Sequence, residues 1–139
     1  MPKTLTARDR AVELEQDAVR YPGECYEILL EAAEAWQEAG EPDRAVALWL
    51  EVIEACGEDA GFARYELVEL CFERGRDAEA WEHLRALDDG SADAGPAALV
   101  AELLARRGHD EAALQWFNRA IVALGADELA AIGQPGGTR

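Results

Sequence analysis

The sequence predicts an all-α fold in which antiparallel pairs of helices follow one another along the chain. One observation is a repeated phrase: DRAVEL begins at Asp9, and DRAVAL begins at Asp43, thirty-four residues later. The other is the spacing of apolar residues, which recur at i, i+3, i+4, i+7 and i+8 as on one face of a helix. A clear set is Ala45, Leu48, Trp49, Val52 and Ile53. No strand pattern competes with these helices.

The spacing of the repeated phrase continues along the chain. An alanine opens the apolar stripe of each repeat at offsets of 34, 35 and 33 residues: Ala11, Ala45, Ala80 and Ala113. A glycine lies five residues before the last three of these alanines: Gly40, Gly75 and Gly108. Glycine ends a helix at little cost because it adopts the left-handed conformation easily. We therefore expect a lone helix followed by three helix-turn-helix units.

Each expected helix has local signals at its ends. Pro42 suits the first turn of one helix, and Asp77 and Asp110 are placed to cap the starts of two others. Breaks rich in Gly, Pro and Asp separate the units: YPGE at 21–24, CGEDAG at 56–61 and DDGSADAGP at 88–96. The expected helices span 5–20, 24–39, 43–56, 60–74, 77–88, 95–107 and 110–124.

The repeat resembles the tetratricopeptide repeat (TPR) family over residues 9–124. The family's second helix carries an alanine, a large apolar residue and a small residue at the spacing of Ala113, Phe117 and Ala120. Small residues are needed where helix axes approach to about 8–10 Å. Departures are Val68, where a small residue is expected, and the missing proline after each second helix. In this resemblance Trp49, Leu84 and Phe117 fill the space between successive units.

The resemblance implies a right-handed α-solenoid of antiparallel helix pairs, a TPR-like superhelix. A single domain is expected over residues 1–124, with the lone helix at 5–20 and repeats at about 24–58, 59–93 and 94–125. The lone helix corresponds to the second helix of a repeat unit whose first helix is missing. Its Glu15 is polar, as expected for the exposed face of a terminal helix. Residues 125–139 are expected to form a short turn and a flexible Gly/Pro tail, a candidate truncation point of a longer protein.

Composition excludes several classes of function. The formal charge of −16 disfavours nucleic acid and anionic membrane surfaces, because both require basic residues on the protein. No apolar run approaches the roughly eighteen residues needed to cross a bilayer, and no secretion signal opens the chain. We expect a cytoplasmic protein. Lys3 is the only lysine among many arginines, a bias typical of a GC-rich bacterial genome.

The sequence carries no motif of an enzyme, a cofactor site or a metal site. Its glycines are helix stops and form no phosphate-binding loop. His83 and His109 have no neighbouring ligands at metal-binding spacing, which favours surface or capping roles. The three cysteines, Cys25, Cys56 and Cys71, lie in apolar-periodic segments and are expected to be buried reduced thiols. We expect a non-catalytic protein without a cofactor or metal.

The resemblance places the candidate binding site on the first helices of the units, which line the concave face in the family. Glu34, Glu69 and Glu102 are equivalent in the three units and predict a row of carboxylates. Such a groove suits a basic or amphipathic peptide, whose cations pair with carboxylates or rest on aromatic rings. The candidate residues are Glu27, Glu34, Glu38, Phe62, Tyr65, Glu69, Phe72, Glu73 and Glu102.

Three alternatives stay open at this point. The glutamates are equally explained as a solvated surface of a strongly acidic chain, with Phe62 and Phe72 in the core. The array could instead form a homo-oligomer, either through the helix at 5–20 or through the end near Leu129 and Ile132. A regulatory or spacer role within a longer protein is the third alternative.

Overall fold

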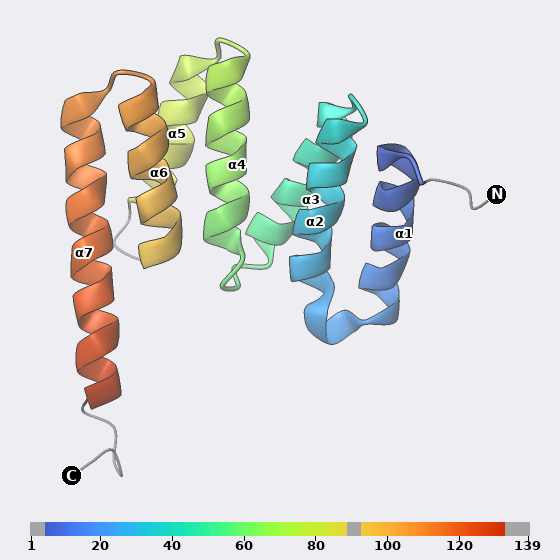
Figure 1. The fold of residues 1–139 in the computed structure, drawn as a ribbon, viewed down its shortest axis with the longest axis horizontal. Helices are drawn as coiled ribbons and strands as arrows, with labels where there is room; N and C mark the ends of the chain where they lie inside the picture. The colour runs from blue at the N-terminus through green and yellow to red at the C-terminus, as the bar shows by residue number, and fades with distance from the viewer. Residues whose placement is uncertain (1–4, 89–92, 133–139) are drawn as a thin grey trace. The chain divides into compact units, whose positions relative to one another are not determined.

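The computed structural model describes residues 5–88 and 93–132, with side chains as far as Ala126. Over these residues the fold is all-α, without strands (Figure 1). The described helices are α1 Ala7–Arg20, α2 Cys25–Glu38, α3 Pro42–Glu54, α4 Ala60–Glu73, α5 Asp77–Leu87, α6 Ala94–Arg106 and α7 Asp110–Ile132. A 3₁₀ turn, η1 Pro22–Glu24, joins α1 to α2. The expected boundaries agree with these to within a few residues, except at the end of α7.

Helix α7 runs to Ile132, although its end was expected near residue 124. Gly125 falls inside the helix and does not stop it. A glycine within a helix costs roughly 1 kcal/mol relative to alanine. The residues that follow it, including Ala126, Glu128 and Leu129, are strong helix formers and offset that cost. The segment 125–139, expected to be a short turn and a tail, is therefore helix as far as Ile132, and residues 133–139 lie outside the described residues.

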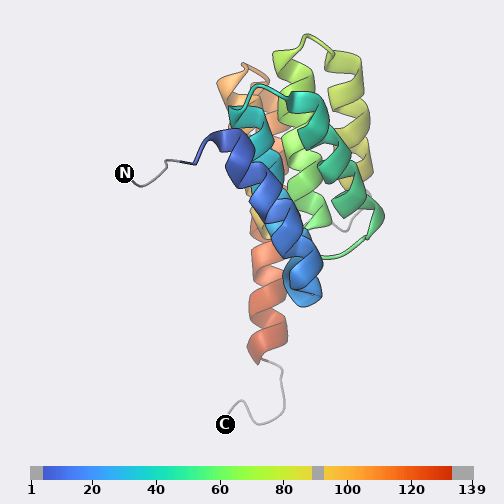
Figure 2. The ribbon, with the colours of Figure 1, turned by 90° about the vertical axis from the view of Figure 1, so that its right-hand side faces the viewer.

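The chain divides into two compact units, residues 1–70 and 71–139, here called the N-terminal and C-terminal units. In the N-terminal unit α1 and α3 both pack against α2, and Figures 1 and 2 show these helices side by side. Alanines with no exposed surface lie in its core, which allows close approach of the helices: Ala11, Ala32, Ala33, Ala35, Ala45 and Ala63. Trp36 and Trp49, each 1% exposed, fill the same core.

Three glycines end helices in the way that the sequence predicts. Gly40, Gly75 and Gly108 have φ angles of 79°, 74° and 85°. At the end of α2, the Gly40 N–H donates to the Gln37 carbonyl at 3.0 Å, and the Glu41 N–H donates to the Trp36 carbonyl at 2.9 Å. This paired pattern satisfies carbonyls that the helix end would leave without partners.

Helix starts differ in part from the sequence prediction. Pro42 occupies the first turn of α3 as expected. Asp77 and Asp110 were expected as caps, but each is the first residue of its helix. Their carboxylates still lie near the positive end of the helix dipole, which stabilises them there. At α1, Thr6 provides a full capping box with Asp9, through bonds of 3.0 and 3.3 Å.

The C-terminal unit contains the packed pair α6 and α7 (Figure 1). Its buried residues include Phe72, whose ring stacks on His109 at 5.9 Å and meets Trp81 edge-on at 5.7 Å between centroids. Leu84 and Trp49 are buried as expected of residues that fill space between helices. Phe117 was expected to do the same but is 39% exposed, because no further described helix follows α7 to cover it.

Candidate functional site

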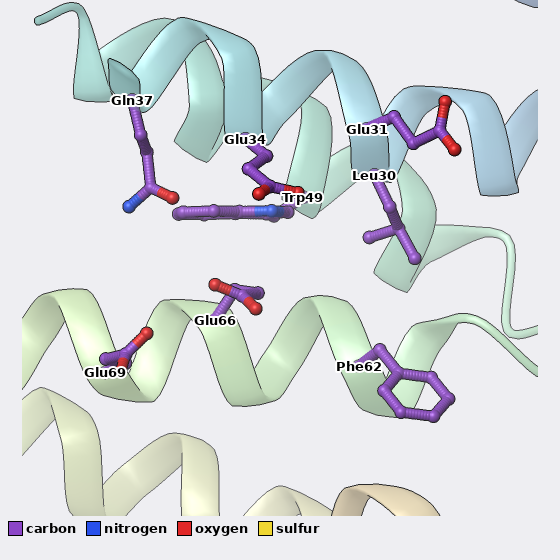
Figure 3. Close-up of a pocket in the computed structure, with 8 residues that line it drawn as sticks. All are labelled: Leu30, Glu31, Glu34, Gln37, Trp49, Phe62, Glu66 and Glu69. Atoms are coloured by element: carbon purple, nitrogen blue, oxygen red, sulfur yellow. The ribbon is translucent and has the colours of Figure 1, made fainter. Parts of the chain in front are cut away.

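A pocket of about 460 Å³ opens between α2 and α4 in the N-terminal unit (Figure 3). It is here called the α2–α4 pocket. Its lining residues come from α2, α3 and α4: Leu30, Glu31, Glu34, Gln37, Trp49, Phe62, Glu66 and Glu69. Four of the eight are glutamates. The pocket therefore combines a high density of carboxylates with aromatic and aliphatic side chains.

Helical spacing explains why these side chains meet. On α2 the sequence Leu30, Glu34, Gln37 follows the i, i+4, i+7 spacing of one helix face. On α4 the residues at 62, 66 and 69 repeat that spacing and place Phe62 and two glutamates on one face. The opposite face of α2 is anchored in the core by its alanines and Trp36, and this anchoring directs Glu34 toward α4.

Apolar and acidic side chains alternate along the pocket. Leu30, Glu31 and Phe62 lie at one end in Figure 3, and Gln37 and Glu69 lie at the other. Between them the Glu34 and Glu66 side chains approach from opposite helices. Phe62 is 36% exposed, so its ring is accessible. This arrangement suits a ligand that has both apolar and cationic groups.

Trp49 lies in the middle of the pocket wall. Figure 3 shows its ring edge-on between the side chains of α2 and those of α4. The side chain is 1% exposed, so the ring belongs to the core of the N-terminal unit and also forms part of the pocket wall.

The electrostatics of the pocket favour a cation. None of its eight lining residues is a lysine or an arginine, and the whole chain carries a formal charge of −16. Glu31 and Glu34 are exposed, whereas Glu66 and Glu69 are partly buried. Several carboxylates in one pocket give it a negative potential, which attracts cations. Within residues 5–88 and 93–126, no three His, Cys, Asp or Glu side chains form a metal-binding group.

The pocket brings together three of the residues proposed from the sequence: Glu34, Phe62 and Glu69. Glu27 is exposed on α2 but does not line the pocket. Glu38 forms an ion pair with Arg10 of α1 and so faces the first helix instead. That pairing depends on where α1 packs, which the repeat pattern alone does not specify.

The remaining proposed residues are not part of the α2–α4 pocket. Tyr65 and Phe72 are buried, at 7% and 2% exposed, so of the three proposed aromatic residues only Phe62 lines the pocket. Glu73 and Glu102 are exposed and belong to the C-terminal unit. The expected row of three equivalent glutamates is thus represented in the pocket by its first two members.

Five lining residues were not among the candidates: Leu30, Glu31, Gln37, Trp49 and Glu66. Glu31 and Glu66 are separated by 35 residues, the same offset that relates Glu34 to Glu69. The repeat offset could therefore have identified this second glutamate pair. Trp49 was assigned to the space between units, and nothing in its spacing shows that part of a core side chain also reaches a pocket.

A second pocket, of about 370 Å³, lies over α1, and several of its lining residues interact with one another. Its lining residues are Val12, Glu15, Gln16, Val19, Trp36 and Arg44. The Trp36 indole N–H donates to the Glu15 carboxylate at 2.6 Å, and the Arg44 guanidinium lies 4.6 Å from the Trp36 ring centroid. Arg44 Nε also lies 3.1 Å from the Glu41 carboxylate. The arginine, the indole and the carboxylates that interact around this pocket therefore all belong to the same chain.

The cysteines give no sign of an activated nucleophile. Cys71 is buried, and burial together with the nearby Glu79 carboxylate raises the pKa of its thiol. A raised pKa leaves less of the reactive thiolate at neutral pH. Cys25 is half-buried, and Cys56 is exposed, contrary to the expectation that all three would be buried. All three are free thiols.

Comparisons of the chain with protein-family models, with curated proteins and with solved structures found no match. The structure itself supports an all-helical fold in which neighbouring helices pack together, as in a helical repeat. In the part of the chain that the structure describes, no helix has the length and apolar character needed to cross a membrane.

Proposed function

We propose that this protein is a non-catalytic protein-binding module that recruits a basic or amphipathic segment of another protein. The α2–α4 pocket is the proposed binding site. The observation that carries the proposal is the presence of four glutamates from two facing helices in one pocket that is also lined by Leu30 and Phe62. Opposite charges would speed the encounter with a basic partner, and Phe62 and Leu30 would bind its apolar side chains.

A TPR-like fold is part of the same proposal. The three left-handed glycines at offsets of 35 and 33 residues and the packed neighbouring helices support a repeat of helix pairs. On this basis we infer a right-handed α-solenoid. Such arrays commonly bind other proteins over extended faces that need no catalytic residues.

A pull-down from a lysate of the source organism tests the proposal. The bait with Glu31→Lys and Glu34→Lys reverses two exposed charges of the pocket, while Glu27→Lys and Glu51→Lys make the same charge change on exposed positions outside it. A basic protein retained by the native chain and the control, lost from the pocket variant and released by salt, is the expected result. Equal retention by all three baits would contradict the proposal.

Self-association is a second candidate function, favoured by the exposed apolar face of α7. Leu114, Phe117 and Ile121 follow the i, i+3, i+7 spacing of one face and are 65%, 39% and 65% exposed. Contiguous exposed apolar side chains often mark an interface. On α1, Val19 is 83% exposed, which offers another surface for contact between copies. The side chains of Leu129 and Ile132, expected to take part, lie outside the described residues.

A further inference from the structure

We infer that two copies of this chain pair through one face of α7, in the manner of a two-stranded coiled coil. The face is formed by Leu114, Phe117, Ile121 and Leu124 and is here called the α7 seam. The inference rests on the self-association named above as the second candidate function, because it identifies the surface and the partner. It is separate from the α2–α4 pocket, whose lining residues all belong to the N-terminal unit.

The seam residues have the spacing of a helix that packs along another helix. Successive members are separated by three, four and three residues, which is the alternation of a and d positions in a heptad repeat. All four side chains are at least 39% exposed, so the row is continuous and open to solvent. Single exposed apolar residues are normal on a protein surface, whereas a contiguous row of them marks an interaction surface.

The other side of α7 is already used within the C-terminal unit. Ala113, Trp116 and Ala120 are buried there, and α6 packs against α7. Helix α6 has 13 residues and α7 has 23, so about 15 Å of α7 extends beyond its neighbour, as Figure 1 shows. Helices in proteins gain most of their stability from the packing of an apolar face. Pairing with a second α7 would supply such packing for the seam.

The charge of the chain explains why a second copy can approach at this face. Two chains that each carry a formal charge of −16 repel each other. Between Glu111 and Asp127, however, the only charged residue is Arg119. Its guanidinium pairs with Asp88 and lies 5.0 Å from the ring centroid of the buried Trp116, and so belongs to the packed side of the helix. Two copies can therefore meet along the seam without bringing carboxylates together.

The positions that flank the seam also carry no charge. In coiled coils these e and g positions usually hold charged residues, which select the partner and its orientation. Here they are Asn118 and Gly125 on one side and Ala113 and Ala120 on the other. A different protein finds no charge here to recognise, whereas an identical helix presents the same apolar row and the same neutral flanks. A two-fold pair of identical surfaces is also the commonest arrangement of oligomers.

Sedimentation equilibrium of the full chain, over a range of protein concentrations, tests the inference. The expected species are the 15.1 kDa chain and one of twice that mass. Pairing should be tighter at about 1 M salt than at about 0.1 M salt, because salt screens the repulsion between two acidic chains. Binding of a basic partner at the α2–α4 pocket should change with salt in the opposite direction.

Two matched variants of α7 locate the interface. Ile121→Lys places a positive charge in the seam, and Val122→Lys places the same charge at the next position, which is exposed but lies outside the seam. Both changes reduce the negative charge of the chain equally, so long-range repulsion does not distinguish them. We expect Ile121→Lys to weaken pairing at least about tenfold, because it buries a charge among apolar side chains. Val122→Lys should not weaken it, and the circular dichroism of both variants should match that of the native chain.

The outcomes separate the inference from the candidate function on which it rests. A native chain that stays monomeric at high concentration overturns both, whether or not the seam binds a different protein. If the two lysine variants pair equally well, the copies associate through another surface, such as the exposed face of α1, and only the inference is wrong. Pairing that weakens as salt is raised would mean that opposite charges hold the copies together, which also overturns the inference.

Discussion

The indole N–H of Trp36 donates a hydrogen bond to the Glu15 carboxylate at 2.6 Å and so joins α2 to α1. Trp36 is 1% exposed, and Glu15 is partly buried. In the repeat, Glu15 occupies the position that corresponds to Trp49, Leu84 and Phe117. A polar residue was expected there only because α1 is the terminal helix and exposes this face. The structure shows that Glu15 also has a specific hydrogen-bond partner, the indole N–H of Trp36.

Replacement of Glu15 should destabilise the N-terminal unit. Glu15→Ala leaves the buried Trp36 N–H without an acceptor, which costs roughly 1–3 kcal/mol. Glu15→Gln keeps a side-chain oxygen at that place and should cost less. Urea denaturation followed by far-ultraviolet circular dichroism measures the change, with Glu13→Ala, at an exposed site on the same helix, as the control. Equal effects of Glu15→Ala and Glu13→Ala would contradict this role.

Gly40, at the end of α2, has a left-handed conformation, so we predict that any side chain at this position lowers the free energy of unfolding. Gly40 has a φ of 79°, and a Cβ at this position would meet no atom within 4 Å. The cost of Gly40→Ala is therefore conformational, about 1–2 kcal/mol. Gly23→Ala is the matched control, because Gly23 also has open space around it but no positive φ. Unfolding free energies should fall for the first variant only; similar values for the two would contradict the assignment.

Cys56 holds the corresponding conformation without being a glycine. Its φ is 55°, just after the end of α3, and its side chain is exposed. Cys56→Gly should raise the free energy of unfolding by about 0.5–1 kcal/mol, because glycine removes the left-handed strain. Cys56→Ala removes the thiol but keeps the Cβ, and so should give no such gain. The idea fails if the glycine variant is no more stable than the alanine variant.

The exposed face of α7 makes a prediction about oligomeric state. If copies associate through Leu114 and Ile121, light scattering after gel filtration should give a multiple of the 15.1 kDa chain mass. Leu114→Glu with Ile121→Glu should then return the chain to the monomer mass, while circular dichroism stays unchanged because both residues are exposed. A native chain that is monomeric at high concentration excludes this interface.

The helices were predictable because their signals are local. Gly40, Gly75 and Gly108 end helices through their own backbone conformation, and the apolar spacing between them specifies which face is buried. The end of α7 was not predictable in this way. Gly125 is only a weak helix breaker, and its effect depends on the sum of propensities that follow it.

The candidate site was predictable only in part. The repeat offset identifies Glu34 and Glu69 because equivalent positions of neighbouring units come together. Burial of Tyr65 and pairing of Glu38 with Arg10 depend on how particular helices pack, which periodicity does not encode. The contribution of Trp49 to the pocket was missed for the same reason, since a core residue and a pocket wall have identical spacing.

Photo-crosslinking from Phe62 tests most directly whether the α2–α4 pocket is the site of partner binding. A benzophenone amino acid replaces Phe62 at the pocket, Leu114 on α7 or Val19 on α1, all exposed positions, and each bait is irradiated in the lysate. The account predicts that the basic partner is captured from position 62 and not from positions 114 or 19, and that added salt lowers the capture. Capture of the partner from position 114 but not from position 62, or capture only of other copies of this chain, would contradict it.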